Sequence, residues 1–156
     1  MNPTTARWFA EYAGDHQHPM NRLTHKLAIP GIVFHVIAML TWVPLPGGAA
    51  VAGFPVTLAL VGWLAGAAFW IWALPRSGGL LAALTLPVAI WGGMVPAPFV
   101  ITLALVAWTV QLAGHKVWEK NKPSFLKNAA HAMVGPLFFA ALLTGELPVR
   151  APASQR

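Results

Sequence analysis

The segment LAIPGIVFHVIAMLTWV, residues 27–43, is apolar apart from one histidine and one threonine, and it carries no formal charge. A run of this kind approaches the ~20 residues that cross the hydrocarbon core of a bilayer, so it predicts a transmembrane helix. Three more uncharged apolar runs follow it, at residues 54–74, 80–95 and 99–113. Turns rich in Pro and Gly separate the runs and predict four spanning helices.

The composition of the whole chain favours a membrane environment. Of its 156 residues, 57% are hydrophobic and only 9% are charged, which is far from the usage of water-soluble domains. A soluble fold of this length could not bury so much apolar surface. We therefore predict one all-α domain over residues 1–156, a polytopic membrane helical bundle. Because the chain has no cysteine, a metal site in it would need His, Asp, Glu or backbone ligands.

Further helical segments flank the four runs. Residues 4–14 predict a short interfacial helix, because Arg7 and Glu11 are spaced i,i+4 while Trp8 and Tyr12 share one face. Apolar residues predict a last helix over 125–143, which could span, re-enter or merely pack. The chain then divides into the interfacial helix and first His box (1–26), the four spanning helices (27–114), the second His box and C-terminal helix (115–147), and a tail (148–156).

The positive charges predict the orientation of the bundle. They lie before the first apolar run, after the second and after the fourth, at Arg22, Lys26, Arg76, Lys116, Lys120, Lys122 and Lys127. Short loops rich in Lys and Arg stay in the cytoplasm, so both His-bearing segments are expected at the cytoplasmic face of an integral membrane protein. The net charge of +6 includes no long basic run with interleaved aromatics, so no nucleic-acid partner is expected.

Histidines gather in the two polar segments that this topology places at one face. His16, His18, His25, His115 and His131 lie there, and His35 alone lies deeper. Polar residues at helix ends could explain this without any chemistry. The spacing of the residues favours a functional site instead. Asn21 and His25 are spaced i,i+4, as are His115 and Glu119, so each pair would share a helical face. Two such faces, with His16 folded back at Pro19, could meet on one Fe, Zn, Ni or Cu ion.

Two boxes of sequence carry a family resemblance. The segment YAGDHQHPMNRLTHKLAIP, residues 12–30, and the segment GHKVWEKNKP, residues 114–123, resemble the small membrane proteins known as Fe(II)-dependent 2-hydroxy fatty acid dioxygenases. The terminal LTGEL, residues 143–147, resembles the end of bacterial members of that family. His18 and His131 stand where other residues are expected in relatives, which weakens their claim to be obligatory ligands.

The resemblance implies a catalytic role. It implies Fe(II) as cofactor, O2 as co-substrate, and a long-chain 2-hydroxy fatty acid that is shortened by one carbon through α-oxidation. It implies His16, His25 and His115 as iron ligands, and Glu119 as a fourth ligand or as the acceptor that orients an imidazole. Further contacts to the iron, its ligands or the substrate are then expected from His131, Tyr12, Asn21 and Lys120. A bacterial inner membrane is implied, or the endoplasmic reticulum for eukaryotic relatives.

Two other classes of function compete with this one. A noncatalytic haem-binding or electron-carrying bundle would need facing histidines at one depth, and only His35 lies deep enough. A structural or transport protein would use the polar cluster only to cap helices, but the apolar runs hold no acidic residue to carry a coupling ion. The sequence leaves the oligomeric state open.

Overall fold

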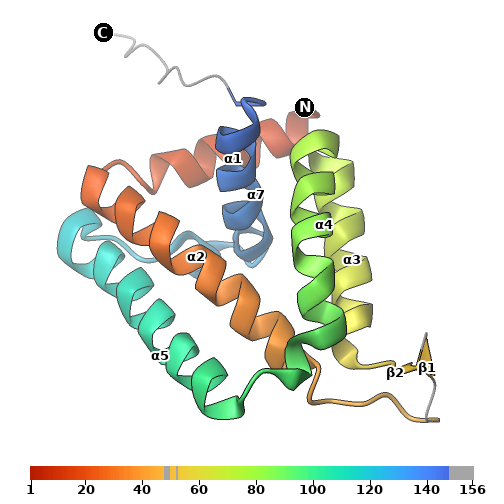
Figure 1. Cartoon of the computed structure of the whole chain (residues 1–156). Coiled ribbons are helices and arrows are strands. Elements are labelled where there is room, and N and C mark those ends of the chain that lie inside the picture. Colours follow the sequence, from red (N-terminus) through yellow and green to blue (C-terminus); the bar gives the residue numbers. More distant parts are fainter. Residues whose placement is uncertain (48–49, 52, 148–156) are drawn as a thin grey trace, which may run out of the picture.

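The protein is helical throughout, apart from one short hairpin, in a computed structural model that describes residues 1–47, 50–51 and 53–147 (Figure 1). The tail predicted at 148–156 lies outside the described residues. In chain order the elements are α1 (Pro3–Gly14), α2 (Pro19–Leu40), β1 (Ala50–Val51), β2 (Phe54–Pro55), α3 (Leu58–Ala73), α4 (Pro75–Trp91), η1 (Gly92–Met94), α5 (Ala97–Ala113), η2 (Gly114–Glu119), α6 (Ser124–Lys127) and α7 (His131–Thr144).

Three helical stretches in the described part of the chain are long and apolar enough to cross a bilayer: Pro19–Leu40, Pro75–Met94 and Ala97–Glu119. The chain is thus an all-helical protein, and these three stretches are consistent with the membrane setting that the composition predicts. The second expected span is the shorter helix α3, whose 16 residues extend about 24 Å at the rise of an α-helix. The last expected helix is divided into α6 and α7.

α2 begins at Pro19, well before the apolar run that starts at Leu27. Proline is favoured in the first turn of a helix, where its missing N–H costs nothing, and His18 caps the helix by accepting from the N–H of Met20 at 3.1 Å. Three polar residues of the first turns, Asn21, Thr24 and His25, are buried, whereas Arg22 and Lys26 on the same turns are exposed. Hydropathy alone predicted that the helix starts only at Leu27, where the polar residues give way to apolar ones. It could not show that some of the polar residues before Leu27 are helical and face inward.

The helices form a V (Figure 1). α2 lies along α5, and α3 and α4 form an antiparallel pair on the other side. At the narrow end Ile37, Ala59 and Ala89 make one apolar cluster. Gly92 allows close approach there, because a Cβ on it would lie 3.0 Å from the Cα of Ala38.

The wide end of the V is filled by α1 and α7. α1 crosses over the bundle, and α7 lies between α2 and the α3–α4 pair (Figure 1). A core cluster joins these elements: Phe9, Tyr12, Trp70, Ala73, Leu74, Val134, Leu137 and Ala141. The last helix is therefore packed inside the bundle. Glu146 fastens its end, because its carboxylate accepts from the hydroxyl of Ser77 and from the Ser77 N–H at 2.7 Å.

Candidate metal centre

Three histidines from distant parts of the chain meet at the wide end of the V. His16 follows α1, His25 lies in the second turn of α2, and His115 lies in η2. Each offers one ring nitrogen, and these nitrogens all lie within 4.8 Å of one another. The three side chains are buried, with 6%, 0% and 2% of their surfaces exposed. The structure thus brings together the three residues that the resemblance implies as ligands, and they could hold a metal ion.

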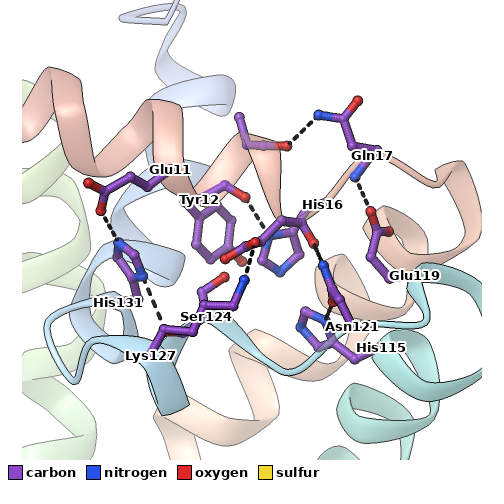
Figure 2. A network of polar contacts seen from close by, with 12 residues as sticks. Glu11, Tyr12, His16, Gln17, His115, Glu119, Asn121, Ser124, Lys127 and His131 are labelled. Carbon is purple, nitrogen blue, oxygen red and sulfur yellow. Dashed lines mark hydrogen bonds and ion pairs between the residues drawn. The ribbon is translucent and has the colours of Figure 1, made fainter.

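Hydrogen bonds define the protonation of the three rings. The Nδ1 of His16 contacts the Tyr12 carbonyl at 2.6 Å, and the Nδ1 of His25 contacts the Asn21 carbonyl at 2.8 Å. The Nδ1 of His115 contacts Oδ1 of Asn121 at 3.0 Å (Figure 2). A carbonyl or amide oxygen can only accept, so each Nδ1 must carry the proton. Each Nε2 is then left with a lone pair, the state in which a histidine binds a metal.

The closest pair of these nitrogens fits a shared cation. Nε2 of His25 and Nε2 of His115 lie 3.0 Å apart. Two lone pairs cannot hydrogen-bond to each other, so the contact is repulsive unless a proton or a metal ion lies between the rings. A cation held by both rings would remove this repulsion, because each lone pair would then face a positive charge.

His16 supplies the third free nitrogen. Its Nε2 is buried and has no hydrogen-bond partner among the residues that the structure describes. Burial lowers the pKa of His16 to about 4, so this ring stays neutral at neutral pH. A buried, neutral, unpartnered nitrogen beside two others is the donor set of a metal site built from imidazoles.

Glu119 was expected to be a fourth metal ligand or to orient an imidazole, and the structure gives it other hydrogen-bond partners. Its carboxylate accepts from the backbone N–H of Gln17 at 2.6 Å (Figure 2). It also accepts from the backbone N–H of His18 at 3.0 Å and from Nδ2 of Asn21 at 3.1 Å. In the described structure its oxygens are not part of the group formed by the three histidine nitrogens, and its hydrogen bonds go to Gln17, His18 and Asn21 rather than to an imidazole. It fastens η2 to the chain entering α2, and so holds the segments that carry His16, His25 and His115 together.

Asn121 holds the His115 ring and was not identified from the sequence. It lies six residues after His115, beyond Lys120, whose φ of 55° turns the chain in a left-handed conformation. The Asn121 Nδ2 contacts the carbonyl of Asp15 at 3.5 Å, which leaves its Oδ1 for the histidine. Helical spacing could not predict this contact, because the backbone is π-helical at 114–119 and then reverses. Lys120 itself is exposed.

Tyr12 contacts the centre through His16. The two rings are stacked with centroids 4.0 Å apart and planes tilted by 20°. The phenolic oxygen is buried and unpartnered within the described residues, and burial raises the pKa of Tyr12. The hydroxyl therefore keeps its proton and is free to donate to a bound molecule.

The other three histidines lie outside the group. His131 is buried, with Nδ1 3.3 Å from the Ser124 carbonyl and Nε2 3.2 Å from Oε2 of Glu11 (Figure 2). His35 accepts a hydrogen bond from the indole N–H of Trp108 at 3.2 Å. Its hydrogen-bond partner is therefore a tryptophan, and not the second histidine that a haem site would need. His18 is exposed, as expected of a solvated residue.

An ion pair beside the centre anchors α6. Lys127 contacts Oδ1 of Asp15 at 2.5 Å. Burial by itself would raise the pKa of Asp15, but the hydrogen bond and the positive charge of Lys127 outweigh it and lower the pKa. The loop before α7 is thereby tied to the residue that precedes His16.

A cavity of about 310 Å³ extends from the histidines into the bundle. Tyr12, His16, Gln111, His115 and His131 lie along it, and all five are buried. Most of the remaining wall is apolar, with residues from α2, α3 and α7 such as Ile29, Val36, Leu40, Trp63, Trp70 and Met133. The volume is at the lower end of the ~300–1,000 Å³ of ligand pockets.

The comparisons with known proteins identify the family. A family model described as 2-hydroxy-palmitic acid dioxygenase Mpo1-like matches residues 3–147. The chain belongs to this family. The resemblance predicted from the two His boxes is confirmed, and the description of the family implies a dioxygenase that acts on a 2-hydroxy fatty acid. No curated protein and no solved structure matches the chain.

Proposed function

We propose that this protein is an Fe(II)-dependent dioxygenase that converts a long-chain 2-hydroxy fatty acid to the acid one carbon shorter. The observation that carries the proposal is the convergence of three buried Nε2 lone pairs at the end of a largely apolar cavity. His16, His25 and His115 would hold the metal. Three protein ligands leave coordination positions open, which suits catalysis better than a closed structural site.

The cavity suits a molecule with a polar head and a long apolar tail. Its wall follows one side of α2 from Ile29 to Leu40, which is about 16 Å at the rise of an α-helix. That length is about half of the ~30 Å hydrocarbon core, which is about the depth that the acyl chains of one leaflet occupy. The carboxylate and 2-hydroxyl would lie at the histidine end, where the Tyr12 hydroxyl is free to donate to them.

The conversion balances with O2 as the sole oxidant. The C1–C2 bond of the 2-hydroxy acid breaks, C2 becomes the new carboxyl carbon, and C1 leaves as CO2 with one molecule of water. When bound, Fe(II) would supply O2 activation and chelation of the head group. The protein would contribute neutral imidazoles held in one tautomer, a phenol that donates without ionising, and a buried site that excludes bulk water.

We further propose four bilayer crossings with the histidines on the cytoplasmic side. A single residue, Leu74, separates α3 from α4, and the two helices pack against each other along their lengths. If α4 spans the membrane, its antiparallel partner traverses the same depth. The Lys and Arg residues at the histidine end favour the cytoplasmic orientation, in a bacterial inner membrane or the endoplasmic reticulum.

The test begins with anaerobic purification, metal analysis and O2-dependent turnover of 2-hydroxyhexadecanoic acid. The expected products are pentadecanoic acid and CO2. His25→Ala should lose both iron and turnover, while His18→Asn, which removes an exposed imidazole but keeps a side chain that can cap α2, should keep both. Full iron and activity in His25→Ala would refute the assignment. A zinc protein indifferent to O2 would redirect it towards hydrolysis, and a Soret band would favour haem binding.

A further inference from the structure

The cavity becomes more exposed as it leaves the histidines. At the polar end its wall is buried, with 2% of His115 and 4% of Tyr12 exposed. Farther along α2 the lining residue Val36 is 41% exposed, and Gly62, which lines the cavity from α3, is exposed as well. In the four-crossing arrangement proposed above, both residues belong to apolar helices that cross the bilayer, so this part of the wall would face hydrocarbon rather than water.

Polar atoms at the inner end call for a ligand with a head group. Gln111 is 7% exposed, lies on α5 within a spanning stretch, and lines the cavity. Its Oε1, like the hydroxyl of Tyr12, is buried without a hydrogen-bond partner in the described residues. Buried polar atoms are rarely left unpaired, so a polar group of a bound molecule would satisfy them. The polar lining residues of the cavity are thus buried, and its exposed lining residues, such as Val36 and Gly62, are apolar.

We propose that the gap between α2 and α3 at Val36 and Gly62 is a lateral portal, through which an acyl chain passes between the bilayer and the histidine site. This inference rests on the proposed function for the identity of the head group. A chain longer than the cavity would extend through the portal into the lipid, so length has no sharp upper limit. The glycine matters because it leaves this side of the gap without a side chain.

The walls of the portal are held in place by hydrogen bonds. The Trp63 indole N–H donates to the Ala82 carbonyl at 3.1 Å and to Oγ1 of Thr85 at 3.2 Å, which fastens the portal side of α3 to α4. Deeper in, the Trp70 indole N–H donates to the Met133 carbonyl at 3.0 Å and ties α3 to α7. The gap therefore lies between a braced α3 and the side of α2 that carries Val36, so filling it with one side chain should obstruct it.

The first test compares chain-length profiles in lipid nanodiscs. Wild-type protein should turn over 2-hydroxy acids from octanoic to tetracosanoic without a cut-off at the long end. Gly62→Leu should lower kcat/KM for the long acids about tenfold and leave 2-hydroxyoctanoic acid within about twofold, because one misplaced side chain in an apolar pocket costs this much. Gly79→Leu is the matched control, since a Cβ there meets nothing within 4 Å in the described structure. Val36→Trp, from the opposite wall, should act as Gly62→Leu does.

A second test needs no turnover. A 2-hydroxyhexadecanoic acid with a photoreactive diazirine two-thirds along its chain should label the α2 and α3 segments around Val36 and Gly62, and Gly62→Leu should abolish that labelling. Labelling elsewhere on the protein, or a Gly62→Leu profile identical to that of Gly79→Leu, would overturn the portal. Labelling at the portal without any O2-dependent shortening would reject the proposed chemistry and keep the portal. Turnover combined with labelling elsewhere would reject the portal and keep the proposed chemistry.

Discussion

Glu119 accepts a hydrogen bond from the side-chain amide of Asn21 at 3.1 Å, although 98 residues separate the two in the chain. The same carboxylate caps the entrance to α2 through the N–H groups of Gln17 and His18. This bond joins the two segments that carry the three histidines. It makes the geometry of the candidate metal centre depend on a residue that does not contact the histidine nitrogens.

Glu119→Gln should therefore weaken metal binding indirectly. The variant loses the charge that strengthens three hydrogen bonds, and we expect a free energy of unfolding lower by about 1–2 kcal/mol. Metal affinity should fall about tenfold, the effect of disturbing residues around a metal's ligands. Thermal unfolding and metal titration in detergent measure the two. If Glu119 were instead an iron ligand, the electron paramagnetic resonance signal of the iron–nitric oxide adduct would change, whereas we expect it unaltered.

Gly114→Ala should separate the helices that carry His25 and His115. A Cβ at Gly114 would lie 2.5 Å from Oδ1 of Asn21 and even closer to Oγ1 of Thr24, both on α2. The helices must move apart, so we expect a loss of about 1–3 kcal/mol in stability and at least tenfold in metal affinity. Thr24→Ala in the same chain removes one of the clashes and should restore part of both. Wild-type metal affinity in Gly114→Ala would contradict this account.

Tyr12→Phe should separate stability from substrate binding. Removing a buried hydroxyl that has no partner in the described structure should leave stability unchanged or slightly raised, because the unpaired group costs free energy. Metal content should stay the same. The KM for the 2-hydroxy acid should rise about tenfold, the effect of losing one hydrogen bond to a charged carboxylate. An unchanged KM would show that the phenol does not contact the substrate.

The metal-free protein should lose stability as the pH falls. Burial lowers the pKa of His16 from 6.5 to about 4, so below pH 6.5 the unfolded chain binds a proton that the folded chain does not. Protonation then favours unfolding, and the loss continues until the pH reaches about 4, where the folded state binds the proton too. Thermal unfolding of chelator-treated protein between these values measures it. His16→Gln should flatten the curve, and an equally steep curve in that variant would assign the effect to other groups.

Apolar runs and polar boxes were enough to predict the class of the molecule. A continuous apolar stretch has no favourable place in water, so the chain's helices and their membrane setting follow from composition and order. The same holds for His16, His25 and His115 as a group, since the boxes that carry them match the family. The limits of α2 were missed, because polarity along a chain does not show which way a side chain points.

Only the tertiary structure decided how those residues work together. Glu119 as a clamp rather than a neighbour of the histidine nitrogens, and the cavity lined by Val36 and Gly62, depend on contacts between distant segments. Asn121 lies only six residues from His115, but it reaches the histidine ring because the chain reverses between them. The positions of Glu119 and Asn121 also depend on the π-helical turn at 114–119 and on the left-handed residue Lys120, where regular helical spacing no longer applies. Periodicity describes one helix at a time, whereas a site is made where several helices meet.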